Sequence, residues 1–414
     1  MEQKRRVLII VENLPCPFDR RVWQEAQALR DAGCVVSIIC PKGKGYDKSF
    51  EQLDGIHIYR HPLPLEAETW YGYAFEYLWA LCAQVLLSLR VLVGPGFDVI
   101  HACNPPDTIF IVAGFYKLFG KKFVFDHHDI NPELYEAKFG RRDMLYRLML
   151  ALERWTFRVA NVSIATNESY KRIAFERGHM PRDKVFVVRS GPSLKRLKIL
   201  PPEPSLRCGK RYLVGYVGVM GRQEGIDLLL QAVRYTVFEK GRTDVHFGLV
   251  GGGTQLAAMQ ILAKELGVAD YVTFTGRVPD AEMLAMLNTA DVCVNPDVVN
   301  EMNDKSTMNK IMEYMALGKP IVQFDLTEGR FSAQEASLYA RPNDPHDLAD
   351  KLLSLLDDED RRRSMGQFGR LRVANELSWE HEVPKLLAAY DAVFATEESA
   401  HVATERPRPG STAV

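Results

Sequence analysis

One pattern occurs twice along the chain: short apolar runs alternate with segments of helical spacing. In the first half, residues 20–32 have helical spacing and end at Gly33, a natural C-terminal stop for a helix. Parallel strands that are buried on both faces read as continuous apolar runs, so this alternation predicts an α/β fold with a covered parallel sheet. The strands expected in the first half are residues 6–11, 35–40, 98–103, 122–125, 162–166 and 185–188.

The pattern stops at residues 190–211, which hold four prolines and several basic residues, and then resumes. The strands expected in the second half are residues 213–217, 246–250, 272–275, 292–295 and 320–324, and the helices include residues 226–239, 308–317, 346–356 and 360–376. A chain of 414 residues is also too long for one comfortable core. We therefore expect two Rossmann-like doubly wound domains with a cleft between them, and ligands at the C-terminal ends of the strands. The expected boundaries are 1–190 for the first domain, 191–211 for a linker, 212–378 for the second domain, and 397–414 for a disordered tail rich in Pro, Ser and Thr.

Cysteine usage and hydropathy bound the cellular setting. The seven cysteines are scattered and form no CxxC pair, which favours a reducing, cytoplasmic compartment over a disulfide framework or a structural zinc site. The N-terminal apolar run is too short for a signal peptide. Residues 73–93 are the most hydrophobic stretch, but Glu76, Gln84, Ser88 and Arg90 interrupt it, so we expect a helix that is buried or lies against something apolar rather than a membrane span.

Charge is distributed unevenly, although the net charge is only −1. Residues 117–211 hold 21 Lys/Arg against 10 Asp/Glu, a surplus of 21 − 10 = +11. This region can be a solvated face, or it can meet anionic lipid headgroups or a phosphorylated acceptor. Within it, residues 141–160 read as an amphipathic helix. Its apolar side holds Leu145, Leu148, Met149, Leu152, Trp155 and Val159, and its basic side holds Arg147, Arg154 and Arg158. We expect the apolar side to face the core; contact with a membrane surface is the alternative.

The most informative loop is 212–225, YLVGYVGVMGRQEG, in which a strand leads through Gly218, Gly221 and Gly225 into a helix. Glycines let a backbone approach a ligand closely, and a helix start offers unpaired N–H groups to an anion. Arg222 lies in this loop, where a guanidinium can bind phosphate in a bidentate manner. The alternative is a strand–glycine–helix turn with purely steric causes.

Two further strand ends carry candidate ligands. Gly251 and Gly252 in LVGGG are followed by no further glycine at dinucleotide spacing and by no carboxylate about 20 residues on at the end of a following strand, which disfavours a nicotinamide site. Arg277 and Val278 follow the next strand and can present backbone groups to a base edge, although a tight turn explains them equally well.

A third segment, 306–320, reads STMNKIMEYMALGKP. Ser306 and Thr307 are expected to cap a helix whose first turn holds Asn309 and Lys310, next to Met308, with Glu313 one turn further on the same side. The helix-start amides and the ammonium suit a diphosphate, and the carboxylate suits the two ribose hydroxyls. A capped surface helix with an ion pair between Lys310 and Glu313 is the alternative.

In the first half, polar residues cluster at two strand ends. His127 and His128, flanked by Asp126 and Asp129, follow one strand. Adjacent histidines on an extended segment point in opposite directions, which disfavours a shared metal and leaves hydrogen bonding to a substrate. Another strand-end loop holds Asp19, Arg20 and Arg21, which can bind a polar or phosphorylated group on the acceptor side. Asp19 can instead be only the N-cap of the next helix.

Taken in order, several segments resemble glycosyltransferase family four, the retaining enzymes with the GT-B fold. The resemblance spans residues 6–394 and rests on PFDRRVWQEAQAL, DHHDINPELY, GYVGVMGRQEGIDLL, LVGGG, FTGRVP, ADVCVNP, MNKIMEYMALGKPIV and LSWE. It is similar in particular to bacterial members that build exopolysaccharide, capsule or O-antigen. It implies two facing Rossmann-like domains, and it implies that residues 379–396 form a helix that returns to the first domain.

The resemblance also assigns roles to residues. Glu313 matches the second glutamate of the Glu-(seven residues)-Glu motif, which holds the ribose, whereas the first glutamate falls at Lys305, so Asp304 or Glu301 would have to replace it. The usual arginine and lysine of the glycine-rich loop fall at Val219 and Glu224, which leaves Arg222 and Lys310 as the expected phosphate ligands. His128 and Asp129 match a His-Asp pair whose histidine contacts the donor sugar. The usual Gly-Gly of the first loop is replaced by LPCP at residues 14–17.

The implied reaction is retaining, metal-independent hexosyl transfer from a nucleotide-sugar. Arg222, Lys310 and helix-start amides stabilise the leaving diphosphate, and the phosphate oxygen serves as base. His128 and Asp129 complete the expected catalytic set, and Asp19, Arg20, Arg21 and His127 are expected on the acceptor side. The expected acceptor is a glycan or a polyprenyl-pyrophosphate-linked sugar, with no cofactor, metal or nucleic acid. The alternatives are a nucleotide-sugar epimerase or hydrolase, or a non-catalytic nucleotide-binding scaffold.

Overall fold

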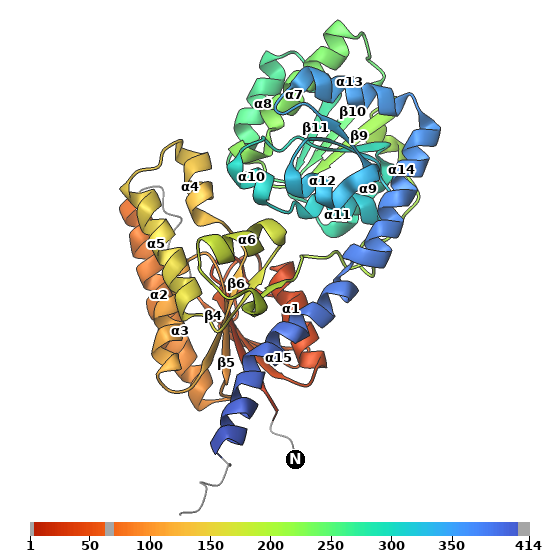
Figure 1. Ribbon diagram of the computed structural model, residues 1–414. Helices are drawn as coiled ribbons and strands as arrows, with labels where there is room; N and C mark the ends of the chain where they lie inside the picture. Colours follow the sequence, from red (N-terminus) through yellow and green to blue (C-terminus); the bar gives the residue numbers. More distant parts are fainter. Residues whose placement is uncertain (1–3, 63–69, 405–414) are drawn as a thin grey trace, which may run out of the picture. The chain divides into compact units, whose positions relative to one another are not determined.

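The computed structural model describes residues 4–62 and 70–404, which form two compact units (Figure 1). The first unit comprises Met1–Pro132, Asp143–Val188 and Val383–Val414. The second comprises Glu133–Arg142 and Arg189–Glu382. Each unit is a mainly parallel sheet with helices, as the alternating pattern predicts. The fold is therefore α/β in both units.

The first unit is built on an eight-stranded sheet of order β3-β4-β2-β1-β5-β6-β7-β8. Every neighbouring pair is parallel except β3 and β4, which form an antiparallel edge. The β3–β4 pair was not expected from the sequence. The strands are β1 (Arg6–Ile10), β2 (Val35–Pro41), β3 (Phe50–Leu53), β4 (Ile56–His61), β5 (Val99–Cys103), β6 (Lys122–His127), β7 (Val162–Ala165) and β8 (Val185–Val187).

Side-chain caps set the start of several helices in this unit. The carboxylates of Asp19 and Asp143 and the amide oxygen of Asn167 accept hydrogen bonds from amides of the first helical turn. The helices are α1 (Arg20–Asp31), α2 (Trp70–Val93), α3 (Phe110–Lys117), α5 (Met144–Val159) and α6 (Glu168–Glu176), with α4 (Asn131–Phe139) at the boundary of the two units. Among the residues described, no helix is long and apolar enough to cross a membrane.

The second unit is built on a six-stranded parallel sheet of order β11-β10-β9-β12-β13-β14. The strands are β9 (Tyr212–Val217), β10 (Val245–Val250), β11 (Val272–Gly276), β12 (Val292–Asn295), β13 (Ile321–Phe324) and β14 (Ser337–Ala340). The helices are α7 (Ile226–Arg234), α8 (Leu256–Glu265), α9 (Asp280–Thr289), α10 (Glu301–Lys305), α11 (Asn309–Ala316), α12 (Thr327–Ala333), α13 (Pro345–Leu356) and α14 (Glu359–Arg372). They bury two apolar clusters, one holding Tyr216 and Leu230 and the other holding Leu287 and Tyr314.

The segment between the two sheets packs against the second unit. The amide of Leu200 donates to Asn288 Oδ1 at 3.0 Å, and that of Glu203 donates to Thr289 Oγ1 at 2.8 Å. The irregular segment 191–211 is thus held against the end of α9 by side chains that accept hydrogen bonds from its backbone amides.

The last helix, α15 (Trp379–Thr404), begins in the second unit and continues in the first. The hydroxyl of Tyr390 lies 2.8 Å from Nδ1 of His101 on β5, and Arg5 forms a 2.8 Å ion pair with Asp391. The expected disordered tail begins at 397, but the helix extends to Thr404; residues 405–414 lie outside the described part of the chain.

Candidate active site

Three neighbouring strands of the second unit, β9, β10 and β11, end at one edge of the sheet, and their loops are joined by backbone hydrogen bonds. Gly218 N donates to Val250 O at 3.0 Å, and Met220 N donates to Gly252 O at 2.9 Å. Gly251 N then donates to Gly276 O at 2.9 Å. The glycine-rich loops therefore form one connected framework.

Close backbone approach explains part of the glycine pattern. Gly251 has φ +137°, and a Cβ built there would lie 1.8 Å from the carbonyl oxygen of Gly218. Gly225 has φ +60°, and its Cβ would lie 2.0 Å from Pro296 O. Steric need thus accounts for both positions without a ligand. A ligand role must rest on the other groups of these loops.

Arg222 lies in the loop after β9, where the sequence placed it. Its side chain is exposed, and no ion-pair partner is found for it within residues 4–62 and 70–404. The neighbouring Glu224 turns inward instead, and its Oε2 accepts from Gly221 N at 3.0 Å. Burial raises the pKa of Glu224. The loop therefore presents a cation outward and closes on itself with a carboxylate.

Lys310 does not pair with Glu313, contrary to the alternative expected for a surface helix. Its Nζ lies 2.6 Å from Asp297 Oδ1 and 5.0 Å from the ring centre of Tyr216, and the Lys310 side chain is only 10% exposed. Burial lowers the pKa of Lys310, but the neighbouring Asp297 and Tyr216 outweigh this and raise it. Burial likewise raises the pKa of Asp297 against the effect of Lys310. The ammonium is thus charged and largely withdrawn from solvent.

Helix α11 begins differently from the sequence expectation. The N-cap is Met308, which provides no side-chain cap. Ser306 belongs to the end of α10, where its hydroxyl donates to Met302 O at 2.7 Å, and Thr307 Oγ1 lies 3.4 Å from a guanidinium nitrogen of Arg189. The prediction that Ser306 and Thr307 cap this helix was wrong, because α10 and its C-cap occupy the residues before Met308. Asn309 is exposed in the first turn of α11.

Glu313 is held by a residue that sequence reasoning missed. Its carboxylate forms a close ion pair with Arg196 from the segment between the sheets, and Arg196 also contacts Asp280 at 3.0 Å. Separations of 117 and 84 residues hide such pairs from any local pattern. Arg277, which is close to Asp280 in the sequence, is exposed. Val278 is partly buried and packs against the apolar cluster that holds Tyr314.

Lys305 and its two expected substitutes have partners of their own. Lys305 Nζ lies 2.6 Å from Glu301 and 3.6 Å from Glu133. Asp304 accepts from the amide of Thr327 at 2.8 Å and from its hydroxyl at 3.0 Å, so it anchors the start of α12. Glu301 is the more exposed of the two carboxylates, and it also forms an ion pair with Arg142 at 2.7 Å.

The adjacent histidines at the end of β6 point to opposite sides, as extended geometry predicts. His127 is 1% exposed; it lies 3.4 Å from Glu153 and packs against Phe157 and Tyr170. The prediction that His127 contacts an acceptor was wrong, because the ring is part of the core. His128 keeps some exposure, and its Nε2 lies 2.5 Å from Asp126 Oδ2.

The loop expected on the acceptor side divides into a cap and a buried ion pair. Asp19 Oδ1 accepts from Val22 N at 3.1 Å and is the N-cap of α1. Arg21 is buried, with ion pairs to Asp126 at 2.9 Å and Glu25 at 3.1 Å. The acceptor role predicted for Arg21 was wrong, since its guanidinium is engaged inside the unit; Arg20 is exposed.

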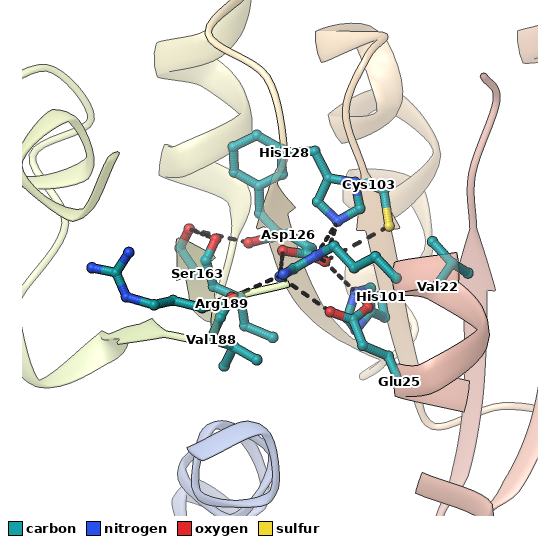
Figure 2. Close-up of polar contacts among 12 residues, drawn as sticks. Val22, Glu25, His101, Cys103, Asp126, His128, Ser163, Val188 and Arg189 are labelled. Carbon is teal, nitrogen blue, oxygen red and sulfur yellow. Dashed lines mark hydrogen bonds and ion pairs between the residues drawn. The ribbon is translucent and has the colours of Figure 1, made fainter. Parts of the chain in front are cut away.

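Figure 2 shows the buried polar cluster behind His128. Burial raises the pKa of Asp126, but Arg21 and His128 outweigh this and hold it well below its usual range. Burial raises the pKa of Glu25 well above its usual range and lowers that of His101. Arg21 therefore supplies the positive charge that faces Asp126 in this cluster, and burial favours the uncharged forms of Glu25 and His101.

The same cluster has the composition of a metal site. Glu25, His101, Cys103 and Asp126 each offer a ligand atom, and these atoms lie within 4.8 Å of one another. However, Arg21 forms ion pairs with both carboxylates, at 3.1 Å from Glu25 and 2.9 Å from Asp126. The guanidinium already supplies the positive charge that a metal would bring, so these residues do not fit a metal centre.

Asn104 is a positioning residue that the sequence did not reveal. Its Oδ1 accepts from the amides of His128 at 2.7 Å and Asp129 at 3.1 Å, and its Nδ2 donates to Asp107 at 3.0 Å. Burial raises the pKa of Asp107 to about 6. Asn104 directly follows strand β5, and a polar residue at that point was the available signal.

Family models match both halves of the chain. Residues 19–191 match the glycosyl transferase 4-like domain, and residues 211–358 match glycosyl transferases group 1. The chain is 27% identical over 68% of its length to a 2-deoxystreptamine glucosyltransferase of Streptomyces kanamyceticus, of which it covers 73%. It is 28% identical to a D-inositol 3-phosphate glycosyltransferase of Corynebacterium jeikeium, but spans only 43% of that relative.

Solved structures agree with this assignment at the level of the fold. A sucrose-phosphate synthase from Thermosynechococcus elongatus superposes with a TM-score of 0.76 at 20% identity, over 95% of this chain and 100% of the other. Anabaena HepE in complex with UDP-glucose superposes with a TM-score of 0.70 at 14% identity, over 94% and 99%. With two such family models in order along one chain, and this fold, the protein belongs to the glycosyltransferases of the GT-B fold.

Proposed function

We propose that this glycosyltransferase is retaining and metal-independent and takes its sugar from a nucleoside diphosphate donor. The observation that carries the proposal is the charge of the second unit. Arg222 is exposed at the end of β9, and Lys310 is buried and protonated beside the ring of Tyr216 on β9. Glu313 of the same helix lies one turn beyond Lys310. These groups suit a diphosphate and a ribose.

The proposed chemistry follows from where charge develops. The bond between sugar and diphosphate breaks, and the leaving oxygens gain negative charge. Arg222, Lys310 and the amides at the start of α11, which has no side-chain cap, would stabilise that charge. A cation in a partly desolvated site acts more strongly than one in water. These positive groups do the work that a metal ion does in other transferases.

For the first unit we propose that His128 contacts the transferred sugar, by its match to the family motif. Its ring is held by Asp126 and its backbone by Asn104. The proposed acceptor is a glycan or a polyprenyl-pyrophosphate-linked sugar in surface polysaccharide synthesis. We further propose that the enzyme works at the inner face of the cell membrane, where such acceptors reside.

Calorimetric titration with UDP, GDP and ADP tests donor binding. We expect at least one nucleotide to bind, and Arg222→Ala and Glu313→Ala each to weaken it about tenfold, or about 1.4 kcal/mol. Arg234→Ala is the matched control, because Arg234 is an exposed arginine of the same unit with a surface partner, Glu239, at 3.7 Å. Equal affinity in both site variants and the control would remove the assignment.

Two further measurements test the finer claims. Turnover is expected to persist in EDTA; loss of turnover that magnesium or manganese restores would contradict metal independence. The anomeric configuration of the product, followed by NMR, is expected to equal that of the donor. An inverted product would contradict the retaining mechanism.

A further inference from the structure

Helix α2 differs from an ordinary surface helix in where its polar and apolar side chains lie. Its buried side carries polar residues: Gln84 donates to Glu12 at 3.1 Å, and the Ser88 hydroxyl lies 2.9 Å from that of Tyr116. Its exposed side is mostly apolar from residue 78 onward, with Leu86 68% exposed and Arg90 as the exposed charge of this part of the helix. The exposed apolar residues of α2 are Leu78, Trp79, Val85, Leu86, Leu89, Leu92 and Val93. Of the polar residues that interrupt this stretch in the sequence, Gln84 and Ser88 are therefore core contacts, whereas Arg90 is exposed.

The exposed apolar surface continues onto α3, which packs against both α2 and α5 (Figure 1). On and just after α3, it includes Ile111, Phe115, Leu118 and Phe119, with Leu118 82% exposed. Their spacing of four, three and one residues places them on one side of the helix. The neighbouring Val112, Ala113 and Tyr116 are buried, so α3 is apolar both on the side that faces the core and on the side that is exposed.

Helix α5 completes this surface and reverses the sequence expectation. Leu145, Leu148 and Trp155 were expected to face the core, but all three are exposed. The residues that face the core are Tyr146, Glu153, Thr156 and Phe157. The prediction of a core-packed apolar side was wrong for these three residues, and the other three of that side, Met149, Leu152 and Val159, are half-buried. The fully buried side is made by polar and aromatic residues, such as Thr156, whose hydroxyl donates to Asp107 O at 2.7 Å.

The charges on α5 indicate what this surface meets. Arg147, Arg154 and Arg158 are exposed, and no ion-pair partner is found for them among the residues described. Arg158 lies 5.4 Å from the ring centre of Trp155. The one carboxylate of the helix, Glu153, is buried against Arg177 and His127. Unpaired arginines beside exposed leucines and a tryptophan match an interface with anionic headgroups above and acyl chains below.

We propose that the exposed apolar and basic surface of α2, α3 and α5, here called the three-helix face, docks the protein on an anionic lipid bilayer. The apolar side chains would enter the headgroup–acyl boundary, and the three arginines would contact lipid phosphates. Contiguous apolar surface of this kind is rare on monomeric proteins that have no partner. The proposal deepens the membrane location given above, and assigns it to this face rather than to the basic region 117–211 as a whole.

Other arginines of residues 117–211 argue against a basic surface that covers this whole region. Arg196 and Arg207 lie in the second unit and are paired with Glu313 and Asp291. Arg177 is paired with Glu153. These three arginines are thus held by specific carboxylates, whereas the arginines of α5 lie exposed beside the apolar helices.

Co-sedimentation with vesicles tests the proposal. The full-length protein is mixed with vesicles of phosphatidylcholine alone or of equal parts phosphatidylcholine and phosphatidylglycerol. We expect binding to the anionic vesicles that weakens with salt but is not abolished, because the apolar contribution is not screened. The double variant Leu86→Glu/Leu118→Glu is expected to reduce partitioning about tenfold or more, since it removes two exposed leucines that would enter the bilayer.

A matched control keeps the result specific. Ile261→Glu places the same charge at a residue of α8 that is 57% exposed in the second unit, and is expected to leave vesicle binding unchanged. The triple variant Arg147→Gln/Arg154→Gln/Arg158→Gln should flatten the salt dependence. Tryptophan quenching by brominated lipid is expected to fall in Trp155→Phe, which reports insertion at α5 itself.

Two outcomes would overturn the proposal. One is wild-type protein that ignores anionic vesicles at low salt. The other is wild-type protein that dimerises in sedimentation velocity and that Leu86→Glu/Leu118→Glu converts to monomer without any effect on lipid binding, which would assign the face to a second copy. Nucleotide titration of the same variants separates this test from donor binding: the variants are expected to bind nucleotide like wild type.

Discussion

At the residue scale, the pair formed by Lys310 and Asp297 joins stability to proposed function. Both side chains are nearly withdrawn from solvent, and each makes the charge of the other tolerable. A buried pair of this kind contributes little net stability, but removing one partner is costly. Asp297 therefore holds the ammonium of Lys310 in the place where the proposed function requires it to meet a phosphate.

Lys310→Met is expected to lower stability by about 3 kcal/mol, because it leaves Asp297 buried without its cation. The double variant Lys310→Met/Asp297→Asn should regain most of that loss, since no unpaired charge remains. Urea unfolding measures both. Nucleotide affinity should stay weak in the double variant; its recovery together with stability would show that Lys310 does not bind phosphate.

Glu25 yields a pH-dependent prediction. Its pKa is raised by burial, so the folded protein keeps the proton that the unfolded chain releases above its usual pKa. Glu25 thus costs stability as pH rises above about 4, by up to about 1.4 kcal/mol per pH unit. Glu25→Gln is expected to be more stable than wild type at neutral pH, with a gain that shrinks towards pH 4.

The measurement is denaturant unfolding of Glu25→Gln and wild type across this pH range. Glu168→Gln, at an exposed carboxylate on α6, controls for the loss of one glutamate. A Glu25→Gln variant that is less stable than wild type at pH 7, and increasingly so with rising pH, would mean that Glu25 is ionised in the folded protein.

At the element scale, the start of α1 separates two roles that the sequence left open for Asp19. As N-cap, its carboxylate satisfies an amide of the first turn. Asp19→Ala is expected to cost about 1 kcal/mol in thermal or denaturant unfolding, and Asp19→Ser should retain most of that stability. Neither should change the KM for the acceptor. A raised KM in Asp19→Ser, with stability retained, would restore the acceptor role.

The loop after β10 gives a second element-scale prediction. Gly251→Ala would press a Cβ into the carbonyl of Gly218, so it should cost about 3 kcal/mol or more and distort the loop after β9. Gly276→Ala is the matched control: it has φ +67° and open space around its Cβ position, so it should cost only about 1 kcal/mol. Equal losses in chemical denaturation would contradict the close approach of the two loops.

Helices and strands were predictable where a local sequence pattern had a single structural explanation. The apolar runs of β9 and β10 and the glycines after them are found where the sequence indicated. The side of α5 that faces the core was not predictable, because helical spacing identifies an apolar stripe without saying what covers it. The partner of Glu313 was also hidden, since Arg196 lies 117 residues away.

At the scale of the whole molecule, the division into two α/β units and their glycosyltransferase fold followed from the repeated alternation and the ordered motifs. The sequence could not indicate that Arg21 forms ion pairs with the carboxylates near His128, because that network joins α1, β5 and β6 through side chains. It also could not indicate that the segment 191–211 is hydrogen-bonded to the end of α9.

The most direct test of the central claim is a crystal structure of the protein with UDP, GDP or ADP at saturating concentration, whichever binds in calorimetry. The account predicts the diphosphate within hydrogen-bond distance of Arg222 and the amides at the start of α11, and the ribose hydroxyls at Glu313. A diphosphate bound elsewhere, with Arg222 and Glu313 both free of the nucleotide, would contradict it.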